Sequence, residues 1–104
     1  MKHAFLIAAV LLSTSAAQAG EPTKDETCKR WGDLAAKIMD LRQLEEPMSS
    51  VIKLIASDNE SKITRAIIID AYNQPSYKTK QNQKRAIAEF RNRVELGCFK
   101  NTTK

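Results

Sequence analysis

The chain has 104 residues, a formal net charge of +5 at pH 7, one histidine, two cysteines and three glycines. This length is that of a single domain. The three glycines lie far apart in the sequence, so no Gly-rich phosphate-binding loop is present. No recognisable motif for reading nucleic acid accompanies the positive charge, which argues against nucleic acid as the partner.

Residues 1–19 have the three parts of an export signal. Met1 to His3 form a short, positively charged start, Ala4 to Leu12 are all apolar, and Ala17-Gln18-Ala19 has the small-x-small pattern that a signal peptidase recognises. The alternative is a membrane span, but this apolar run is well short of the roughly 20 residues that cross a bilayer as a helix. We therefore expect a signal peptide that is cleaved after Ala19.

The mature chain, Gly20 to Lys104, is expected to be soluble, with no transmembrane segment. Gly20 rather than a cysteine follows the cleavage site, so we expect no lipid anchor, and the form of the signal is typical of a bacterial periplasmic or secreted protein. Cleavage also removes His3, the only histidine. Without a histidine, the mature chain cannot form a catalytic Ser-His or Cys-His pair or a His-containing zinc site. We expect neither a cofactor nor a metal.

Two helices are predicted in the first half of the mature chain. Thr23 and Glu26 match a capping box, in which each side chain accepts a hydrogen bond from the other residue's backbone N–H. Apolar residues then recur at helical spacing until Glu45-Glu46-Pro47 stops the first helix. This apolar stripe comprises Cys28, Trp31, Ala35 and Ile38. Trp31 is therefore expected in the core rather than in a ligand site. A shorter second helix is predicted over Met48 to Ala56, ending at Ser57 to Asn59.

Two further helices are predicted in the second half. Apolar spacing places a third helix from about Glu60 to Tyr72. The run Ile67 to Ile69 favours a strand by propensity, but the longer 3.6-residue pattern outweighs it. The fourth helix is predicted from about Thr79 to Gly97, because a glycine can terminate a helix. Its apolar stripe comprises Ile87, Phe90, Val94 and Cys98. The predicted fold class is all-α, a small bundle of about four helices.

The two cysteines, Cys28 and Cys98, lie on the apolar stripes of the first and last predicted helices. A domain of about 85 residues often has a core of marginal stability, and disulfides persist in exported proteins. We predict one disulfide, which an antiparallel or crossed arrangement of these helices would allow. The alternative is a pair of free, buried thiols. Closing so long a loop stabilises a fold by roughly 4 kcal/mol in the chain-entropy description.

Five short segments carry a resemblance to known sequences. In chain order they are Cys28-x-x-Trp31, Ile38-Met39-x-x-Arg42-Gln43, Ile69-Asp70-Ala71-Tyr72-x-x-Pro75, Ala86-Ile87-x-Glu89-Phe90-x-Asn92 and Cys98. The chain resembles a group of short exported, functionally uncharacterised two-cysteine helical proteins of proteobacteria and their phages. The resemblance covers nearly the whole mature chain and supports its boundaries and the cysteine pair. It implies no activity and no functional residues.

Positive charge is concentrated in the last third of the chain. Residues 75–104 contain eight basic and two acidic residues, whereas residues 20–74 contain eight basic and ten acidic residues. Such a region can attract a polyanion, for example lipopolysaccharide, anionic lipid or an acidic protein face. The alternative is an ordinary solvated helix face, on which helical spacing aligns Lys80, Lys84 and Arg91.

Carboxylates are the remaining candidates for catalysis. A glycoside hydrolase needs two of them facing each other across a cleft, and several formal pairs exist. The candidates are Glu45, Glu46, Asp58, Glu60 and Asp70. Nothing in the sequence selects one pair, and four helices in so short a chain leave little material for a cleft. We therefore expect no catalytic residues and no enzymatic activity.

The stretch Ala71 to Tyr77 joins the third and fourth predicted helices. Pro75 cannot continue a helix, and Ser76 or Thr79 can cap the next one, so the stretch is first of all a corner between helices. It also carries two tyrosines, and a tyrosine on a polar loop is a favoured anchor for protein partners. The predicted partner-binding residues are Tyr72, Tyr77, Lys78, Lys80 and Lys84.

Two functions remain open from the sequence. The first is a non-catalytic interaction protein, of the inhibitor, immunity or adaptor type, that binds another exported protein through the Tyr72 to Lys80 corner and the start of the last helix. The second is an envelope-surface binder that uses the basic last third on anionic lipid or polysaccharide. A salt titration separates them, because binding to an anionic surface weakens steeply as screening increases.

Overall fold

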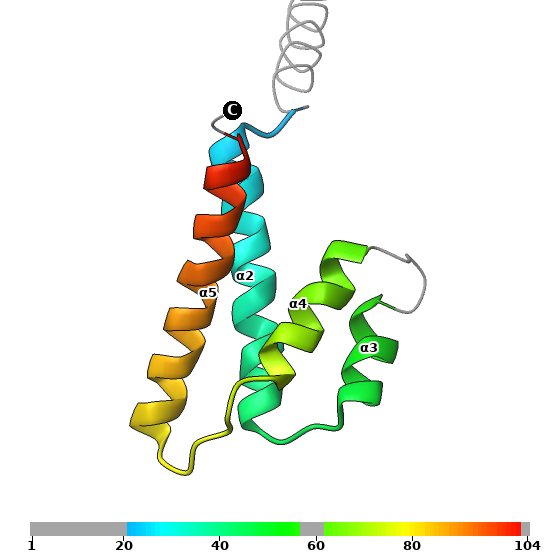
Figure 1. The fold of residues 1–104 in the computed structure, drawn as a ribbon, viewed down its shortest axis with the longest axis vertical. Coiled ribbons are helices and arrows are strands. Elements are labelled where there is room, and N and C mark those ends of the chain that lie inside the picture. The colour runs from blue at the N-terminus through cyan, green and yellow to red at the C-terminus, as the bar shows by residue number, and fades with distance from the viewer. Residues whose placement is uncertain (1–20, 57–61, 103–104) are drawn as a thin grey trace, which may run out of the picture.

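The computed structural model describes residues 21–56 and 62–102, which contain four α-helices (Figure 1). These are α2 (Lys24–Gln43), α3 (Met48–Ala56), α4 (Lys62–Tyr72) and α5 (Lys80–Thr102). No strand occurs in this part of the chain, so the predicted all-α fold class is confirmed. The predicted signal peptide, the helix end at residues 57–59 and the helix start at Glu60 lie outside the described residues.

The two longest helices, α2 and α5, lie side by side and antiparallel (Figure 1). α4 packs against α2, and α3 packs mainly against α4, so the two short helices form a hairpin beside the C-terminal half of α2. α4 leans away from the long pair toward its Lys62 end (Figure 1). The two short helices therefore cover the α2–α5 pair less near the start of α2 than near its end.

The hydrophobic core lies where these helices meet. Its largest fully buried side chains are those of Ile38, Met39, Ile68, Val51 and Cys28. Burying an aliphatic side chain of this size stabilises a fold by about 1.5–3 kcal/mol before the loss of chain entropy. Phe90 is the buried contribution of α5, whereas Trp31 packs against the core and is half-buried. The expected core position of Trp31 is thus confirmed only in part.

Local hydrogen bonds determine where α2 begins and ends. The predicted capping box is present, because Thr23 N–H donates to the Glu26 carboxylate at 2.8 Å and Glu26 N–H donates to the Thr23 hydroxyl at 3.1 Å. At the other end, the N–H groups of Glu45 and Glu46 bond back to carbonyls of the last turn, at 2.9 and 3.1 Å. Glu45 adopts a left-handed φ of 64°. This turn, in addition to the following proline, ends α2 where the sequence predicted.

α5 begins as predicted but does not end at Gly97. Thr79 caps its start, since its hydroxyl accepts a hydrogen bond from Asn82 N–H at 3.2 Å. The prediction that Gly97 terminates the helix is wrong, because α5 continues to Thr102. A glycine ends a helix where the chain turns left-handed, and Gly97 has no positive φ. Cys98, directly after it, is tied to α2, which keeps this turn of α5 packed on its neighbour.

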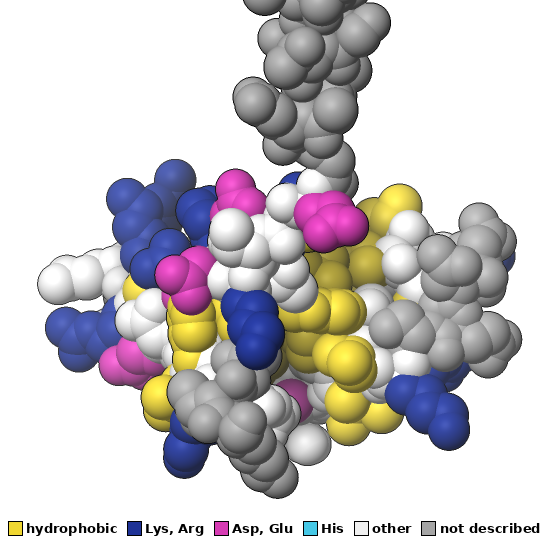
Figure 2. Space-filling view, turned by 90° about the horizontal axis from the view of Figure 1, so that it is seen from above, with side chains coloured by type: hydrophobic (Ala, Val, Ile, Leu, Met, Phe, Trp, Pro, Cys, Tyr) yellow, Lys and Arg dark blue, Asp and Glu magenta, His cyan; other side chains and the backbone are white. Residues whose placement is uncertain are grey.

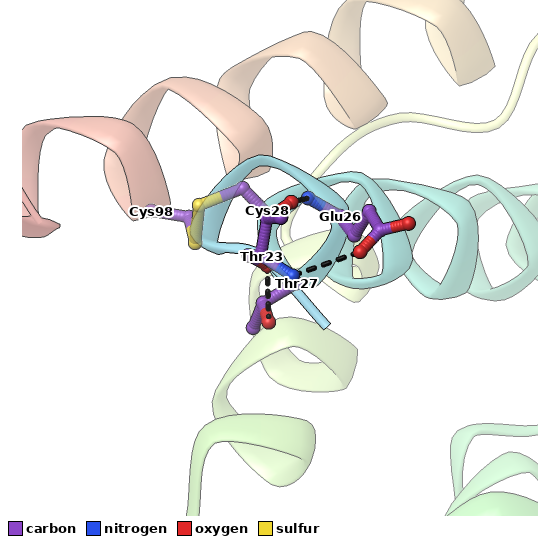
Figure 3. The surroundings of a disulfide bond; sticks show 5 residues. All are labelled: Thr23, Glu26, Thr27, Cys28 and Cys98. Atoms are coloured by element: carbon purple, nitrogen blue, oxygen red, sulfur yellow. Dashed lines mark hydrogen bonds between the residues drawn. A yellow bond between two sulfur atoms is a disulfide. The ribbon is translucent and has the colours of Figure 1, made fainter. Parts of the chain in front are cut away.

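The predicted disulfide joins Cys28 to Cys98, with an S–S distance of 2.06 Å and 5.5 Å between the Cα atoms (Figure 3). Cys28 is fully buried and Cys98 is half-buried. The bond lies beside the Thr23–Glu26 capping box in the first turns of α2 (Figure 3). The disulfide therefore holds this end of the α2–α5 pair together, the cap stabilises the first turn of α2, and the bundle is closed by this disulfide as expected.

Candidate functional site

The candidate site is the segment between α4 and α5, residues 71–80, called the corner below. It lies at the end of the molecule remote from the disulfide (Figure 1). Residues 73–79 form no helix, so most of their backbone N–H and C=O groups need partners other than those of a helix. Side chains from α2 and α5 supply several of these partners.

Gln43, the last residue of α2, holds the middle of the corner. Its side chain is 3% exposed, and its amide group both donates a hydrogen bond to the backbone of the corner and accepts one from it. Gln43 Nε2 donates to the Pro75 carbonyl at 2.9 Å, and Tyr77 N–H donates to Gln43 Oε1 at 2.7 Å. The amide also lies 3.4 Å from the Met39 sulfur. One buried side chain thus satisfies two backbone groups and fixes the path of the chain between them.

Three further side-chain hydrogen bonds fix the corner. They run from Arg42 Nε to the Gln74 carbonyl (3.0 Å), from Ser76 Oγ to a Glu45 carboxylate oxygen (3.2 Å) and from Gln83 Nε2 to the Tyr77 carbonyl (2.8 Å). The residues that form these three bonds with the corner are Arg42 in the last turn of α2, Glu45 just after α2, and Gln83 in the first turn of α5. The corner is therefore a rigid segment whose ordering entropy is already lost on folding.

Tyr72 has a structural position within the corner. The ring is half-buried, and its hydroxyl donates a hydrogen bond to the Glu46 carbonyl. The guanidinium of Arg42 lies 5.2 Å from the ring centroid, which is a favourable cation–π distance. Tyr72 therefore joins α4 to the end of α2 and to the segment that follows it.

The burial of Tyr72 predicts an alkaline pH dependence. Burial raises the pKa of the Tyr72 hydroxyl above its ordinary value of 10.0; Arg42 opposes this shift and Glu46 adds to it. Because the folded-state pKa is the higher one, the stabilising effect is complete below the pKa of unfolded tyrosine and is lost as pH rises through the folded-state value. We expect the unfolding free energy to fall above about pH 10.

The measurement is denaturant unfolding between neutral and strongly alkaline pH, compared with the Tyr72→Phe variant. That variant keeps the ring and removes the ionisable group, so its curve should fall less in the alkaline range. Parallel pH curves for the two proteins would contradict this prediction.

Tyr77 is the more accessible of the two tyrosines, with 41% of its surface exposed. It borders two surface hollows of about 260 and 160 Å³. Ala86 and Glu89 of α5 line both hollows as well, and Arg85 lines the smaller one. Tyr77 is thus an exposed aromatic side chain between two small depressions, with charged groups beside it.

The predicted lysines lie apart from the Tyr77 hollows. Lys78, Lys80 and Lys84 are all exposed, but Lys80 and Lys84 lie about 100–180° around α5 from Arg85 and Glu89, at 100° per residue. The structure therefore brings Tyr77 together with Arg85 and Glu89. The sequence reasoning missed both of these residues, although their spacing of four marks them as one face of a helix.

The other charged candidates are largely engaged within the chain. Asp70 forms an ion pair with Arg93 at 2.8 Å, and Glu45 accepts the hydrogen bond from Ser76. Asp58 and Glu60 lie outside the described residues. In the parts of the chain that the structure describes, no group of three potential ligands is placed to hold a metal ion, and no helix is long and apolar enough to span a membrane.

Comparison with known proteins finds no family model, curated protein or solved structure that matches this chain. What distinguishes the corner is its own geometry. A buried amide and two other side chains bond to its backbone, Ser76 bonds to Glu45, and an exposed tyrosine projects from it.

Proposed function

We propose that this chain is a non-catalytic interaction protein of the inhibitor, immunity or adaptor type, which binds another exported protein through the corner. The observation that carries the proposal is the rigid presentation of Tyr77. Its backbone N–H is bonded to Gln43 and its carbonyl to Gln83, while much of its ring stays exposed. An aromatic group fixed before binding loses little entropy on association, which is typical of interface hot spots.

The two tyrosines have different roles in this proposal. Tyr72 stabilises the corner through its hydrogen bond and its contact with Arg42. Tyr77 is the anchor, and Arg85 and Glu89 beside it form part of a polar rim that is suited to specific hydrogen bonds with the partner. The exposed lysines of the corner and of early α5 steer an acidic partner toward this end of the molecule.

The distribution of positive charge favours a protein partner over an anionic envelope surface. A flat surface attracts the charges on one face of a helix, but the basic residues of α5 are spread around it. Arg93 is already paired with Asp70, and Arg91 is half-buried. Lys80, Lys84, Arg85 and Lys100 are exposed, but they do not share one side of the helix.

The partner is sought by affinity capture from a periplasmic extract, with the mature chain and its Tyr77→Ala variant as parallel baits. We expect one protein to be captured by the first bait and lost from the second. Its affinity for Tyr77→Ala should be lower by about 2 kcal/mol, roughly 30-fold, with an unchanged melting temperature. Tyr72→Ala should instead lower the melting temperature, and any loss of binding should follow that loss of stability.

A Tyr77→Phe variant separates the ring from its hydroxyl and serves as the matched control. Full-strength binding by folded Tyr77→Ala would remove the corner as the binding site. Steeply salt-dependent binding to anionic vesicles, unaffected by Tyr77→Ala, would instead support the envelope-surface alternative.

Export is a separate part of the proposal and has its own measurement. We expect the protein recovered from the periplasm or medium to have the intact mass of residues 20–104, because the three-part start directs cleavage after Ala19. Recovered material that still contains residues 1–19 would contradict this prediction.

A further inference from the structure

A second surface feature lies between α4 and the α2–α5 pair, away from the corner. It is a groove of about 420 Å³, called the Trp31 groove below. Trp31 of α2 lines it together with Ile63 and Ile67 of α4 and with Val94 and Gly97 of α5. Figure 2 looks onto the end of the molecule where α2 begins and shows hydrophobic side chains gathered in the middle of this face.

An ion pair borders the groove. Asp70 of α4 and Arg93 of α5 both line the groove, and their side chains are 2.8 Å apart. This pair connects the two walls where α4 and α5 come together. From there the walls diverge, because α4 leans away from the long helices (Figure 1).

The groove exists because the bundle is incomplete along part of its length. At a rise of 1.5 Å per residue, α4 spans roughly 16 Å, whereas α2 spans roughly 30 Å. Ile63, near the start of α4, is consequently 57% exposed although it lies on an apolar wall. An additional helix along this part of α2 would bury Ile63 and the accessible part of Trp31.

Gly97 leaves room for an occupant at the α5 wall of the groove. Glycine in a helix interior is about 1 kcal/mol less favourable than alanine. The buried Gly32 has a steric reason within the chain, because a Cβ there would lie 2.2 Å from Glu95 Oε2. At Gly97 nothing lies within 4 Å of the position of a Cβ, and the residue lines the groove. Its missing side chain leaves the α5 backbone open to close approach from the groove.

The charge around the groove indicates the polarity of the occupant. Arg93 and Asp70 both line the groove and neutralise each other in their ion pair. On the other side of Trp31, Arg30 lines a second apolar hollow of about 280 Å³ together with Leu34. Among the charged residues that line the two hollows, Arg30 is therefore the one that is not neutralised by an ion pair. This arrangement is complementary to acidic side chains.

We propose that the Trp31 groove docks an amphipathic helix of a partner protein. Its apolar residues, at i, i+3, i+4 and i+7, lie between Ile63 and Val94, and acidic residues on its flank face Arg30. The helix passes closest to α5 at Gly97, because helices pack at about 8–10 Å only where the side chains at the contact allow it. A pocket for a small ligand encloses most of the ligand surface, whereas this groove is open along the exposed Ile63.

The test is a selection from a display library of peptides of about 15 residues with a fixed helical apolar pattern and randomised flanks. The target is the mature chain with its disulfide intact. We expect the enriched peptides to be acidic on the flanks and to bind Ile63→Ser at least tenfold more weakly. Leu54→Ser is the matched control, because Leu54 on α3 is 70% exposed and lies outside the groove. Binding to this control should be unchanged.

Gly97→Ala makes the test sharper because the melting temperature and the peptide affinity should change in opposite directions. Alanine should raise the melting temperature by improving helix propensity, and should lower the affinity of the selected peptides severalfold. Arg30→Glu should weaken the acidic peptides, whereas Lys53→Glu on α3 should not. A Tyr77→Ala variant should bind them normally, so failure of the corner and failure of the groove are distinguishable.

Several outcomes would overturn the proposal. These are no enrichment of helical peptides, selected peptides that bind Ile63→Ser undiminished, and peptides with basic flanks. Binding of dodecanoate that is lost in Ile63→Ser, with no peptide enriched, would assign the groove to lipid. A dimer of this chain that dissociates in Ile63→Ser would assign it to a second copy.

Discussion

Replacing Cys98 with serine should lower the free energy of unfolding by roughly 2–5 kcal/mol. The disulfide joins residues 70 positions apart, so it removes far more freedom from the unfolded chain than from the folded one. Cys28→Ser should have at least as large an effect, because Cys28 is fully buried and a hydroxyl there needs a partner. Denaturant unfolding of each variant, followed by circular dichroism, measures these differences.

Reduction of the unmodified chain is the matched control. It should lower stability to nearly the level of Cys98→Ser, and it should have no effect on the Cys28→Ser, Cys98→Ser double variant. Two thiols that are alkylated without prior reduction would show that the bond is absent from the protein.

The disulfide prediction also separates the two proposed binding surfaces. Cys98 lines the Trp31 groove, whereas the corner is held by its own hydrogen bonds at the other end of the molecule. A folded Cys98→Ser variant should therefore bind groove peptides more weakly while keeping binding that depends on Tyr77. Equal losses at both surfaces would indicate that the whole bundle has loosened.

The helices and the disulfide were predictable because their signals are local. Apolar spacing, the Thr23–Glu26 capping box and two cysteines on apolar stripes each operate within a few turns of helix. The prediction that α5 ends at Gly97 was wrong because it considered the glycine alone and not the packing of α5 on its neighbour. Packing against α2, secured by the disulfide at Cys98, continues α5 beyond it.

The candidate sites were less predictable because they depend on distant contacts. The sequence drew attention to both corner tyrosines but could not separate a half-buried Tyr72 from an exposed Tyr77. Gln43 gave no signal of its own, since its partners lie 32 and 34 positions away. The Trp31 groove was not predictable either, because it results from the short length and the tilt of α4.

The segments Ile38 to Gln43 and Ile69 to Pro75 meet at the corner. The side chains of Arg42 and Gln43 in the first segment donate hydrogen bonds to the backbone carbonyls of Gln74 and Pro75 in the second. Tyr72 of that second segment contacts Arg42 through its ring. Residues that are unspecific when taken singly thus form one connected structure that holds Tyr77 in place.

Replacing Gln43 with leucine should lower the free energy of unfolding by about 2–3 kcal/mol, although leucine is apolar and similar in size. The Pro75 carbonyl and the Tyr77 N–H would each lose their partner in a partly buried site, and an unsatisfied group of this kind costs about 1–3 kcal/mol. Denaturant unfolding measures the loss. Gln83→Ala is the control, because it removes one exposed hydrogen bond to the same corner and should have a smaller effect.

A Gln43→Glu variant shows which bond of the amide matters. A carboxylate can still accept from Tyr77 N–H but cannot donate to the Pro75 carbonyl, and it places a charge at a buried position. Protonation restores the donor, so this variant should gain stability relative to the unmodified chain as pH falls from 7 toward 4. Partner binding through Tyr77 should recover over the same pH range. If Gln43→Leu unfolds and binds like the unmodified chain, the buried amide is not what holds Tyr77, and rigid presentation no longer supports the corner as the binding site.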